Sequence, residues 1–192
     1  MTRILAFFIM IFLFFVLEGG FLLQKSAIST YEFLFSEPSE NPQIIFGGGY
    51  IFSDVLYLNH GLDDDVQKGD LIVYGKNIAV GKIDEVFSKF SKVVPFSKFG
   101  EKTPFRTGEQ KAVLFEGVGG GAGEISADFP NTVSIKIGEG VYFAQNPNYL
   151  AGVIEDADKK DGRDFQKILI RIPVSLNSIT DVAIIKNNAT ER

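Results

Sequence analysis

The side chains that could do chemistry in this chain begin with its single histidine, His60, which three consecutive aspartates follow at 63–65. A histidine base beside a carboxylate and a nucleophilic serine is the arrangement of a serine hydrolase. The chain has no Gly-x-Ser-x-Gly motif, however, and no serine stands out by a glycine-rich context. Asn59-His60-Gly61 is typical of a turn. We therefore predict no catalytic role for His60.

Metal ligands are scarce in the sequence. A zinc site needs three or four N, S or O ligands, and the chain offers one histidine and no cysteine. Segment 156–162 resembles the start of an EF-hand loop, but its third acid lies one position late and position twelve is Lys167 instead of glutamate. We interpret this segment and the aspartate run at 63–65 as solvated loops, and predict no metal site.

A glycine-rich run at 117–122 matches the Gly-x-Gly-x-x-Gly/Ala pattern of dinucleotide-binding proteins. That pattern requires a helix directly afterwards, to hold the pyrophosphate at its N-terminus. Segment 124–130 is too short for this and ends in Pro130. We predict an interdomain hinge at 117–123 and no cofactor, and the chain also lacks the Gly-Lys-Ser/Thr of a P-loop. No catalytic, cofactor-binding or metal-binding residue is therefore expected, and the protein is predicted not to be an enzyme.

The charge balance disfavours nucleic acid as a partner. The chain has a net charge of −5 and a pI near 5.0, and no run of Lys and Arg reaches four. Binding to nucleic acid depends on basic side chains that displace counterions from phosphates. The absence of cysteine excludes a disulfide framework, a thiol nucleophile and a lipoprotein anchor.

The N-terminal segment predicts a membrane anchor. Fourteen apolar residues run without interruption from Ile4 to Leu17, and Phe21-Leu22-Leu23 follow shortly after. About 20 helical residues span a bilayer core of ~30 Å. Arg3 is the only charge before this stretch, which favours a cytoplasmic N-terminus and a single pass through the inner membrane, with the remainder extracytoplasmic. The alternative is a signal peptide cleaved near the weak site Ala27-Ile28-Ser29.

Residues 24–46 predict a short stalk and linker. Phe21, Ile28 and Phe35 are seven residues apart, which gives at most two heptads before Pro38 ends any helix. A simple stalk helix is the first interpretation, and weak dimerisation through these positions is the second.

Two stretches of the remaining sequence resemble each other. In each, a glycine–acid pair (69–70 and 138–139) precedes an apolar strand, and after a turn a second glycine (81 and 152) opens an apolar-acidic strand. The two glycines lie 12 residues apart in the first copy and 14 in the second. The repeat indicates two similar β units, an organisation that suits a scaffold better than an enzyme.

We therefore predict a mainly β protein in which an N-terminal transmembrane helix is followed by two small tandem six-stranded β-barrels. The expected boundaries are 1–23 for the anchor, 24–46 for the stalk, 47–118 for the first barrel, 119–186 for the second and 187–192 for a frayed tail. Strands are expected, from apolar runs between turn residues, at 54–58, 71–74, 78–86, 92–96, 112–115, 134–137, 141–143, 150–154, 165–172 and 182–185, with a hairpin turn at 75–77 and one helical turn within 175–180.

The order and spacing of these features resemble the MreC family of bacterial rod-shape-determining proteins. In the first unit the matching residues are Leu58, Asn59, Gly61, Val66, Gly69, Asp70, Val73, Gly81, Val86 and Ser91-Lys92-Val93. In the second they are Gly117, Gly119-Gly120-Gly121, Ile137-Gly138-Glu139, Val141, Leu150-Ala151-Gly152-Val153, Phe165-Gln166, Ile168, Ile170, Pro173, Ile179, Val182 and Ile184.

The resemblance implies a single-pass inner-membrane protein with two extracytoplasmic barrels, similar to chymotrypsin-like barrels but without an active site. It implies a scaffold of the cell-wall elongation machinery, with a class B penicillin-binding protein, MreD and the MreB cytoskeleton as partners. The chain departs from the family in its short stalk, so self-association would have to use the barrel surfaces. It also has Gly138-Glu139 and then Ala144-Gln145-Asn146 where the family has a Gly-Asp and then a Thr-Ser-Gly run.

The function expected from the sequence is thus a non-enzymatic, membrane-anchored scaffold that maintains cell shape by binding wall synthases. Two alternatives stay open at this point. One is an extracytoplasmic trypsin-like protease with His60 as its base, and the other is the β-module of a membrane-fusion or secretion assembly.

Overall fold

The computed structural model describes residues 41–45, 55–159 and 164–187. The predicted anchor at 1–23 and most of the stalk at 24–46 lie outside these residues. Within them there is no α-helix, and hence none of the length and apolarity needed to cross a membrane. The described chain is mainly β, as the sequence predicts, with three short 3₁₀ turns.

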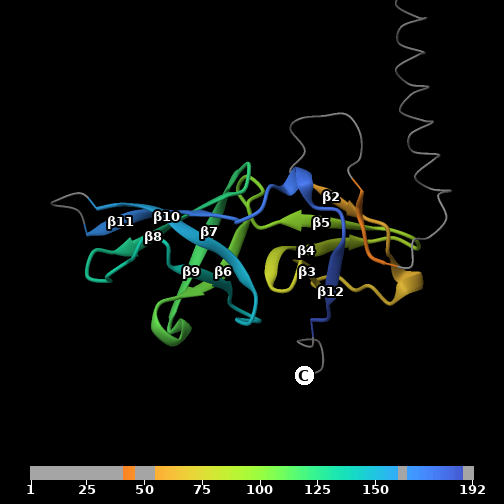
Figure 1. Ribbon diagram of the computed structural model, residues 1–192, viewed down its shortest axis with the longest axis horizontal. Helices are drawn as coiled ribbons and strands as arrows, with labels where there is room; N and C mark the ends of the chain where they lie inside the picture. Colours follow the sequence, from red (N-terminus) through yellow and green to blue (C-terminus); the bar gives the residue numbers. More distant parts are fainter. Residues whose placement is uncertain (1–40, 46–54, 160–163, 188–192) are drawn as a thin grey trace, which may run out of the picture. The chain divides into compact units, whose positions relative to one another are not determined.

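Twelve strands follow one another within the described residues, and Figure 1 labels most of them. They are β1 (Ile44–Ile45), β2 (Leu56–Leu58), β3 (Leu71–Tyr74), β4 (Ile78–Val86), β5 (Ser91–Pro95), β6 (Lys102–Thr107), β7 (Val113–Gly121), β8 (Glu124–Pro130), β9 (Gly140–Phe143), β10 (Leu150–Asp158), β11 (Phe165–Arg171) and β12 (Val182–Ile185). The 3₁₀ turns are η1 (Leu62–Asp64), η2 (Glu109–Lys111) and η3 (Leu176–Ser178).

Six of the strands close into a barrel. Antiparallel pairing runs β6–β7–β8–β11–β10–β9, and β9 returns to β6 through the pairs Phe105–Phe143 and Arg106–Tyr142. The long hairpins β6–β7 and β10–β11 supply most of the wall, and Figure 1 shows these strands grouped on its left side. Closure leaves the ring with no free edge strand.

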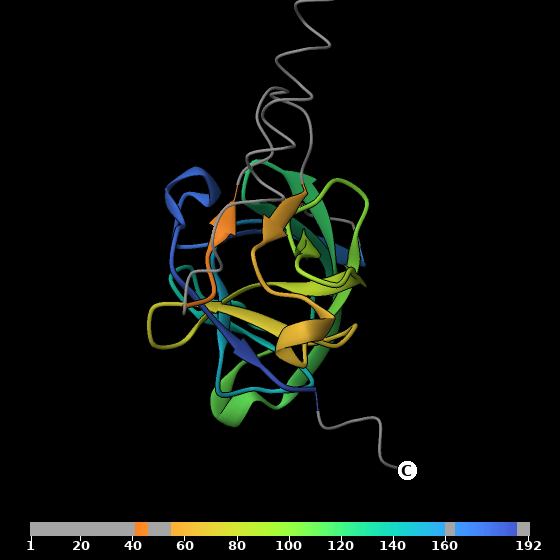
Figure 2. The same cartoon turned by 90° about the vertical axis from the view of Figure 1, so that its right-hand side faces the viewer.

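The other six strands pair in the order β1–β2–β5–β4–β3–β12. A single bridge, Gln43–Asp181, joins the two ends of this series, flanked by backbone hydrogen bonds from Ile44 to Thr180 and from Val182 to Pro42. In Figure 2 these strands face the viewer. A parallel pair, Ile78 with Leu150, links β4 to β10, so that all twelve strands belong to one continuous sheet.

The internal repeat is confirmed at the level of backbone hydrogen bonds. Gly69 donates to Ile83 and Ile83 donates to Asp70, each at 2.8 Å. Gly138 donates to Ile154 at 2.8 Å, and Ile154 donates to Glu139 at 2.9 Å. Both glycines have a positive φ, +91° and +85°, which an L side chain adopts only with strain. Each glycine–acid pair therefore makes the same corner in its own copy.

Two clusters of buried side chains form the core. One is formed mostly by strands of the closed ring, with further residues from β3, β4 and the segment after β5. In it the ring of Phe96 packs against those of Phe105 and Phe143 at 5.5 and 5.1 Å between centroids. The other is aliphatic and includes Leu58, Ile72 and Ile83. Burial of a large apolar side chain contributes roughly 1.5–3 kcal/mol. Phe96, Phe105, Phe129 and Phe143 are the phenylalanines buried in this way among the described residues.

The division of the strands differs from the expected boundaries of 47–118 and 119–186. Strands β6 and β7 fall within the first range but pair with β8 and β9, and β12 falls within the second range but pairs with β3. The chain thus enters the closed ring at Lys102, the start of β6, which is 17 residues before the predicted boundary at 119. It leaves the ring after β11, before β12 pairs with β3.

Two local predictions were wrong. Residues 134–137 alternate in polarity but form no strand, because β10 hydrogen-bonds in this region only to the corner at Gly138 and Glu139. Residues 117–123 are not a hinge. They complete β7 and form the tight turn into β8, with Ala122 at a φ of +51° and Gly123 at +83°.

Candidate partner-binding surfaces

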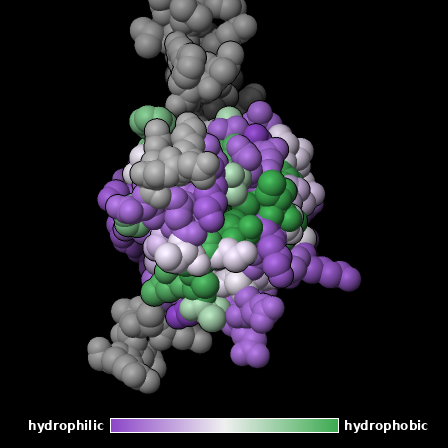
Figure 3. Space-filling model, turned by 90° about the vertical axis from the view of Figure 1, so that its left-hand side faces the viewer, coloured by the Kyte–Doolittle hydropathy of each residue, from purple (hydrophilic) through white to green (hydrophobic). Residues whose placement is uncertain are grey.

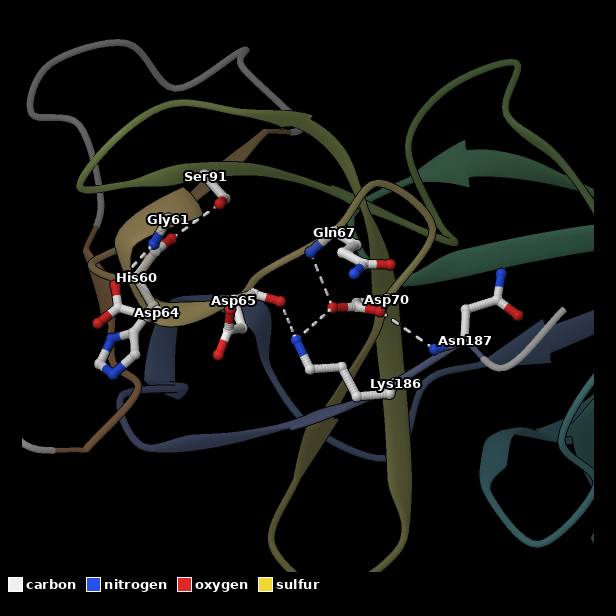
Figure 4. Close-up of polar contacts among 9 residues, drawn as sticks. All are labelled: His60, Gly61, Asp64, Asp65, Gln67, Asp70, Ser91, Lys186 and Asn187. Carbon is white, nitrogen blue, oxygen red and sulfur yellow. Dashed lines mark hydrogen bonds and ion pairs between the residues drawn. The ribbon is translucent and has the colours of Figure 1, made fainter. Parts of the chain in front are cut away.

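His60 lies in a turn and its neighbours are not arranged as a catalytic triad. Its Nδ1 is 2.9 Å from the side-chain oxygen of Asn59. The Ser91 hydroxyl donates a 2.7 Å hydrogen bond to the backbone oxygen of His60, not to its ring, as Figure 4 shows. The Asp64 carboxylate accepts the backbone N–H of Gly61 at 2.9 Å. These contacts fix the turn before η1 and activate no nucleophile.

The aspartate run at 63–65 is a solvated turn, as predicted. All three residues are exposed, two of them within η1, and Asp65 ends the turn with a left-handed φ of 60°. The acidic segment at 156–162 begins within β10, where Asp156 accepts the backbone N–H of its neighbour Ala157 at 2.8 Å. Among the described residues no three side chains are placed to share a metal ion.

A buried carboxylate, Asp70, ties the C-terminal segment to the first corner (Figure 4). It accepts backbone N–H groups from Gln67 at 2.9 Å and from Asn187 at 3.0 Å, and it pairs with the ammonium of Lys186 at 3.2 Å. Lys186 also donates to the backbone oxygen of Asp65. The tail expected to begin at 187 is therefore ordered through Asn187.

A polar groove opens beside this corner. It consists of two adjoining cavities of about 430 and 380 Å³, which share Gly69, Gln145 and Asn187. The larger cavity is lined further by Lys68, Lys82, Ile83, Asp84, Val94, Lys98 and Glu101. The smaller one is lined further by Leu71, Phe143, Asn146, Ile185 and Lys186. The polar groove is thus built from segments far apart in the sequence.

Ion pairs occupy part of the groove wall. Lys68 pairs with Asp84 at 3.1 Å and Lys82 pairs with Glu101 at 2.9 Å. The hydrogen bond from Lys68 lowers the pKa of Asp84; burial opposes this shift, and the charges of Lys68, Lys92 and Lys98 support it. Asp84 is therefore held ionised by the surrounding lysines.

An aromatic patch is centred on the turn between β4 and β5. The rings of Phe87 and Phe90 stack at 4.4 Å between centroids, and Tyr57 lies 6.3 Å from Phe90. Leu62 joins them, because its N–H donates to the backbone oxygen of Phe87 at 2.8 Å. Leu62 is 61 % exposed and Phe87 41 %. We call Tyr57, Leu62, Phe87 and Phe90 the aromatic patch.

Other exposed apolar side chains lie elsewhere, and Figure 3 shows apolar areas between polar ones on the side of the molecule opposite to that in Figure 2. These exposed residues are Phe99, Leu114, Ile137 and Phe165.

Arg171 links three neighbouring strands on the exposed side of the ring. From β11 it donates hydrogen bonds to Glu155 of β10 at 2.7 Å and to Glu124 of β8 at 2.8 Å. These two hydrogen bonds raise the pKa of Arg171.

Sequence reasoning named none of the groove or patch residues as a site. The groove joins five separate regions of the chain through long-range pairing, and the one motif among them, the glycine–acid pair at 69–70, indicated a repeat and not a site. One weak signal for the patch was present in the sequence: Phe87 and Phe90 are large apolar residues in a short turn between two predicted strands, where polar residues are usual. The motifs at 60–65 and 117–122 are accounted for by turns and strands, and residues 156–158 of the third motif end β10, while 160–162 lie outside the described residues.

Comparison with known families decides the relationship of this chain. The family model described as "Rod shape-determining protein MreC, barrel core" matches residues 44–186, which is most of the chain. The chain belongs to the MreC family. A search of curated proteins finds no significant match.

Solved MreC structures share the fold of this chain. The crystal structure of MreC from Pseudomonas aeruginosa aligns with a TM-score of 0.68 at 15% identity, over 76% of this chain and 97% of that one. The orthorhombic crystal form of the major periplasmic domain from the cell shape-determining filament MreC aligns with a TM-score of 0.56 at 12% identity, over 74% of this chain and 93% of that one. A complex between penicillin-binding protein PBP2 and MreC from Helicobacter pylori aligns with a TM-score of 0.53 at 14% identity, over 77% and 98%.

Proposed function

We propose that this MreC-family protein is a non-enzymatic, membrane-anchored scaffold of the cell-wall elongation machinery, which maintains cell shape by holding a wall synthase. The observation that carries the proposal is the family match across residues 44–186. The PBP2–MreC complex from Helicobacter pylori supports a class B penicillin-binding protein as the synthase. MreD and the MreB-linked elongation complex are the further partners that we propose.

The aromatic patch is the surface that we propose for the synthase. Leu62 and Phe87 of this patch are exposed, and the exposed charged residues Asp63 and Lys89 adjoin them in the sequence. Aromatic side chains within a polar rim are the usual composition of the energetic centre of an interface. The contact would bury Leu62 and Phe87, which water otherwise reaches.

Binding of the full-length protein to the extracytoplasmic domain of its class B synthase tests this assignment. We expect Phe87→Ser to weaken the complex at least about tenfold, since an interface anchor contributes roughly 2 kcal/mol or more. Phe165→Ser is the matched control, because Phe165 is likewise an exposed phenylalanine at the end of a β-hairpin. If only Phe165→Ser abolished binding, the synthase contact would lie on the closed ring and not on the aromatic patch.

The anchor is proposed on the apolar stretch from Ile4 to Leu23. Membrane fractionation with alkaline extraction, followed by N-terminal sequencing, distinguishes an intact anchor from a cleaved signal peptide. An intact N-terminus in the membrane pellet supports the single-pass arrangement, and a soluble product that begins near Ser29 contradicts it.

The cellular role is tested by depletion in a rod-shaped host. Rounding of the cells supports the proposal, and unchanged shape contradicts it.

Crosslinking in membranes, with identification of the captured proteins, tests binding to MreD and to MreB-linked partners, and self-association through the β surfaces. Capture of secretion components in place of wall synthases would favour a module of a secretion assembly.

A further inference from the structure

The polar groove gathers positive charge in a chain that is negative overall. Three lysines and two carboxylates line its larger cavity. Lys68 and Lys82 are each paired, with Asp84 and Glu101. Lys98 makes neither an ion pair nor a side-chain hydrogen bond within the described part of the chain, and it acts on Asp84 only through its charge. One ammonium group thus remains available to an anionic ligand.

Side-chain amides lie next to this charge. Gln145 and Asn146 come from the loop between β9 and β10, and Asn187 follows β12. Gln145 is exposed and forms no side-chain hydrogen bond within the described residues. An amide side chain both donates and accepts hydrogen bonds, which matches the alternating donors and acceptors of a peptide backbone.

The smaller cavity has an apolar floor. Leu71 and Phe143 are buried beneath it, and the half-buried Ile185 stands at its side. Each cavity lies within the size range of ligand pockets, about 300–1,000 Å³. The groove therefore offers, in order, a cation, hydrogen-bonding amides and an apolar surface.

We propose that the polar groove binds an extended acidic peptide segment of a partner protein. A carboxylate pairs with Lys98, the peptide backbone bonds to Gln145 and its neighbouring amides, and an apolar side chain covers Ile185. A peptide fits better than a phosphate ligand, because a single uncompensated ammonium beside two carboxylates is a weak phosphate site. The groove and the aromatic patch share no residue, so this site stands independently of the proposed synthase contact.

Fluorescence anisotropy with the full-length protein in detergent tests the proposal. The probe is a fluorescein-labelled peptide Ser-Leu-Asp-Glu-Leu-Asp-Ser, and its comparison is the amide analogue Ser-Leu-Asn-Gln-Leu-Asn-Ser. We expect the acidic peptide to bind at least about tenfold more tightly, a difference that shrinks as NaCl screens the charges. Lys98→Gln should remove most of this preference, and Gln145→Glu should weaken the acidic peptide through repulsion.

Lys102→Gln is the matched control, because Lys102 lies four residues along the chain from Lys98, on the exposed surface outside the groove. Thermal unfolding of all variants confirms that they fold alike. Equal binding of the two peptides overturns the proposal, and so does an equal loss with Lys102→Gln. Displacement of the peptide by inorganic phosphate at the same concentration also overturns it, since the groove would then be a simple anion site.

Discussion

Asp70 is a carboxylate that water hardly reaches, with a relative exposure of 1 %. Its charge is compatible with burial because two backbone N–H groups and the ammonium of Lys186 surround it. Replacement by alanine leaves the N–H groups of Gln67 and Asn187 without an acceptor. We expect Asp70→Ala to lower the free energy of unfolding by about 2–4 kcal/mol, measured by urea denaturation.

Lys186→Gln is the control for this prediction. The Lys186 side chain is 46 % exposed, so its ion pair with Asp70 is partly screened by water. We expect this variant to lose about 1 kcal/mol or less. A loss equal to that of Asp70→Ala would show that the ion pair, and not the pair of backbone hydrogen bonds, holds the corner.

Asp84 gives the protein a defined response to acid. The hydrogen bond from Lys68 lowers the pKa of Asp84 below 3.8, its ordinary value. A carboxyl group whose pKa is lower in the folded state binds its proton more readily when unfolded. Its contribution to stability is therefore complete above pH 3.8 and is lost as the pH falls through the lower, folded pKa.

Denaturation curves at stepwise pH test this contribution. We expect Asp84→Asn to flatten the decline of stability below about pH 4, relative to the parent chain. Asp63→Asn is the comparison, because Asp63 is exposed and no ion pair of its side chain is present among the described residues. An identical acid response in the parent and in Asp84→Asn would contradict the prediction.

At the scale of the element, the two glycine–acid corners were predictable from sequence alone. A glycine that must adopt a positive φ, followed by an acid and an apolar strand, leaves a local pattern at Gly69 and again at Gly138. The extents of β4, predicted at 78–86, and of β11, predicted at 165–172, were likewise found almost unchanged, because apolar runs and the turn residues that end them are also local. Each of these features is fixed by fewer than about ten neighbouring residues.

The pairing of strands and the groove were not predictable in this way. Nothing local in β6 and β7 distinguishes a partner in the first β unit from one in the second, and β12 returns to β3 over more than a hundred residues. The groove depends on that return, because Asn187 and Ile185 reach Gly69 and Gln145 only when β12 is in place. Long-range closure thus created the site that the sequence motifs did not reveal.

The glycine run in β7 tests how closely this element is packed. A Cβ on Gly119 would lie 2.0 Å from the backbone oxygen of Lys98, whereas one on Gly120 would meet nothing nearer than 3.6 Å. We expect Gly119→Ala to destabilise the protein by about 2–3 kcal/mol or more, because backbone on both sides must shift. Gly120→Ala is the adjacent control and should change stability by no more than about 0.5 kcal/mol.

Thermal or urea unfolding measures both variants. Equal stability of Gly119→Ala and Gly120→Ala would contradict the tight approach of β7 to the segment after β5. If only Gly119→Ala destabilises the protein, close packing explains why glycine stands at this position, and no dinucleotide ligand is needed to explain it.

At the scale of the whole molecule, the C-terminal strand joins the two core clusters. The chain leaves the closed ring after β11, passes through η3 and adds β12 to β3. Val182 and Ile184 of β12 pack against the aliphatic cluster, whereas Ile185 packs against the cluster that contains Phe96, Phe105 and Phe143. Residues that hold the first corner are therefore among the last described residues of the chain.

Truncation tests this arrangement. A chain that ends at residue 179 lacks β12 together with Lys186 and Asn187, whereas a chain that ends at residue 187 retains every contact of Asp70 described here. In the shorter chain, β3 loses its hydrogen bonds to β12, and the series of strands around the aliphatic cluster is no longer closed by β12.

We expect backbone amides of β3 and β4 in this shorter chain to exchange with deuterium roughly tenfold faster or more than in the chain that ends at residue 187. The ring β6–β7–β8–β11–β10–β9 lies wholly before residue 179, so its amides should stay protected. Loss of protection throughout the molecule would mean that the two clusters fold as one unit, and unchanged exchange in β3 would mean that β12 adds nothing to its stability.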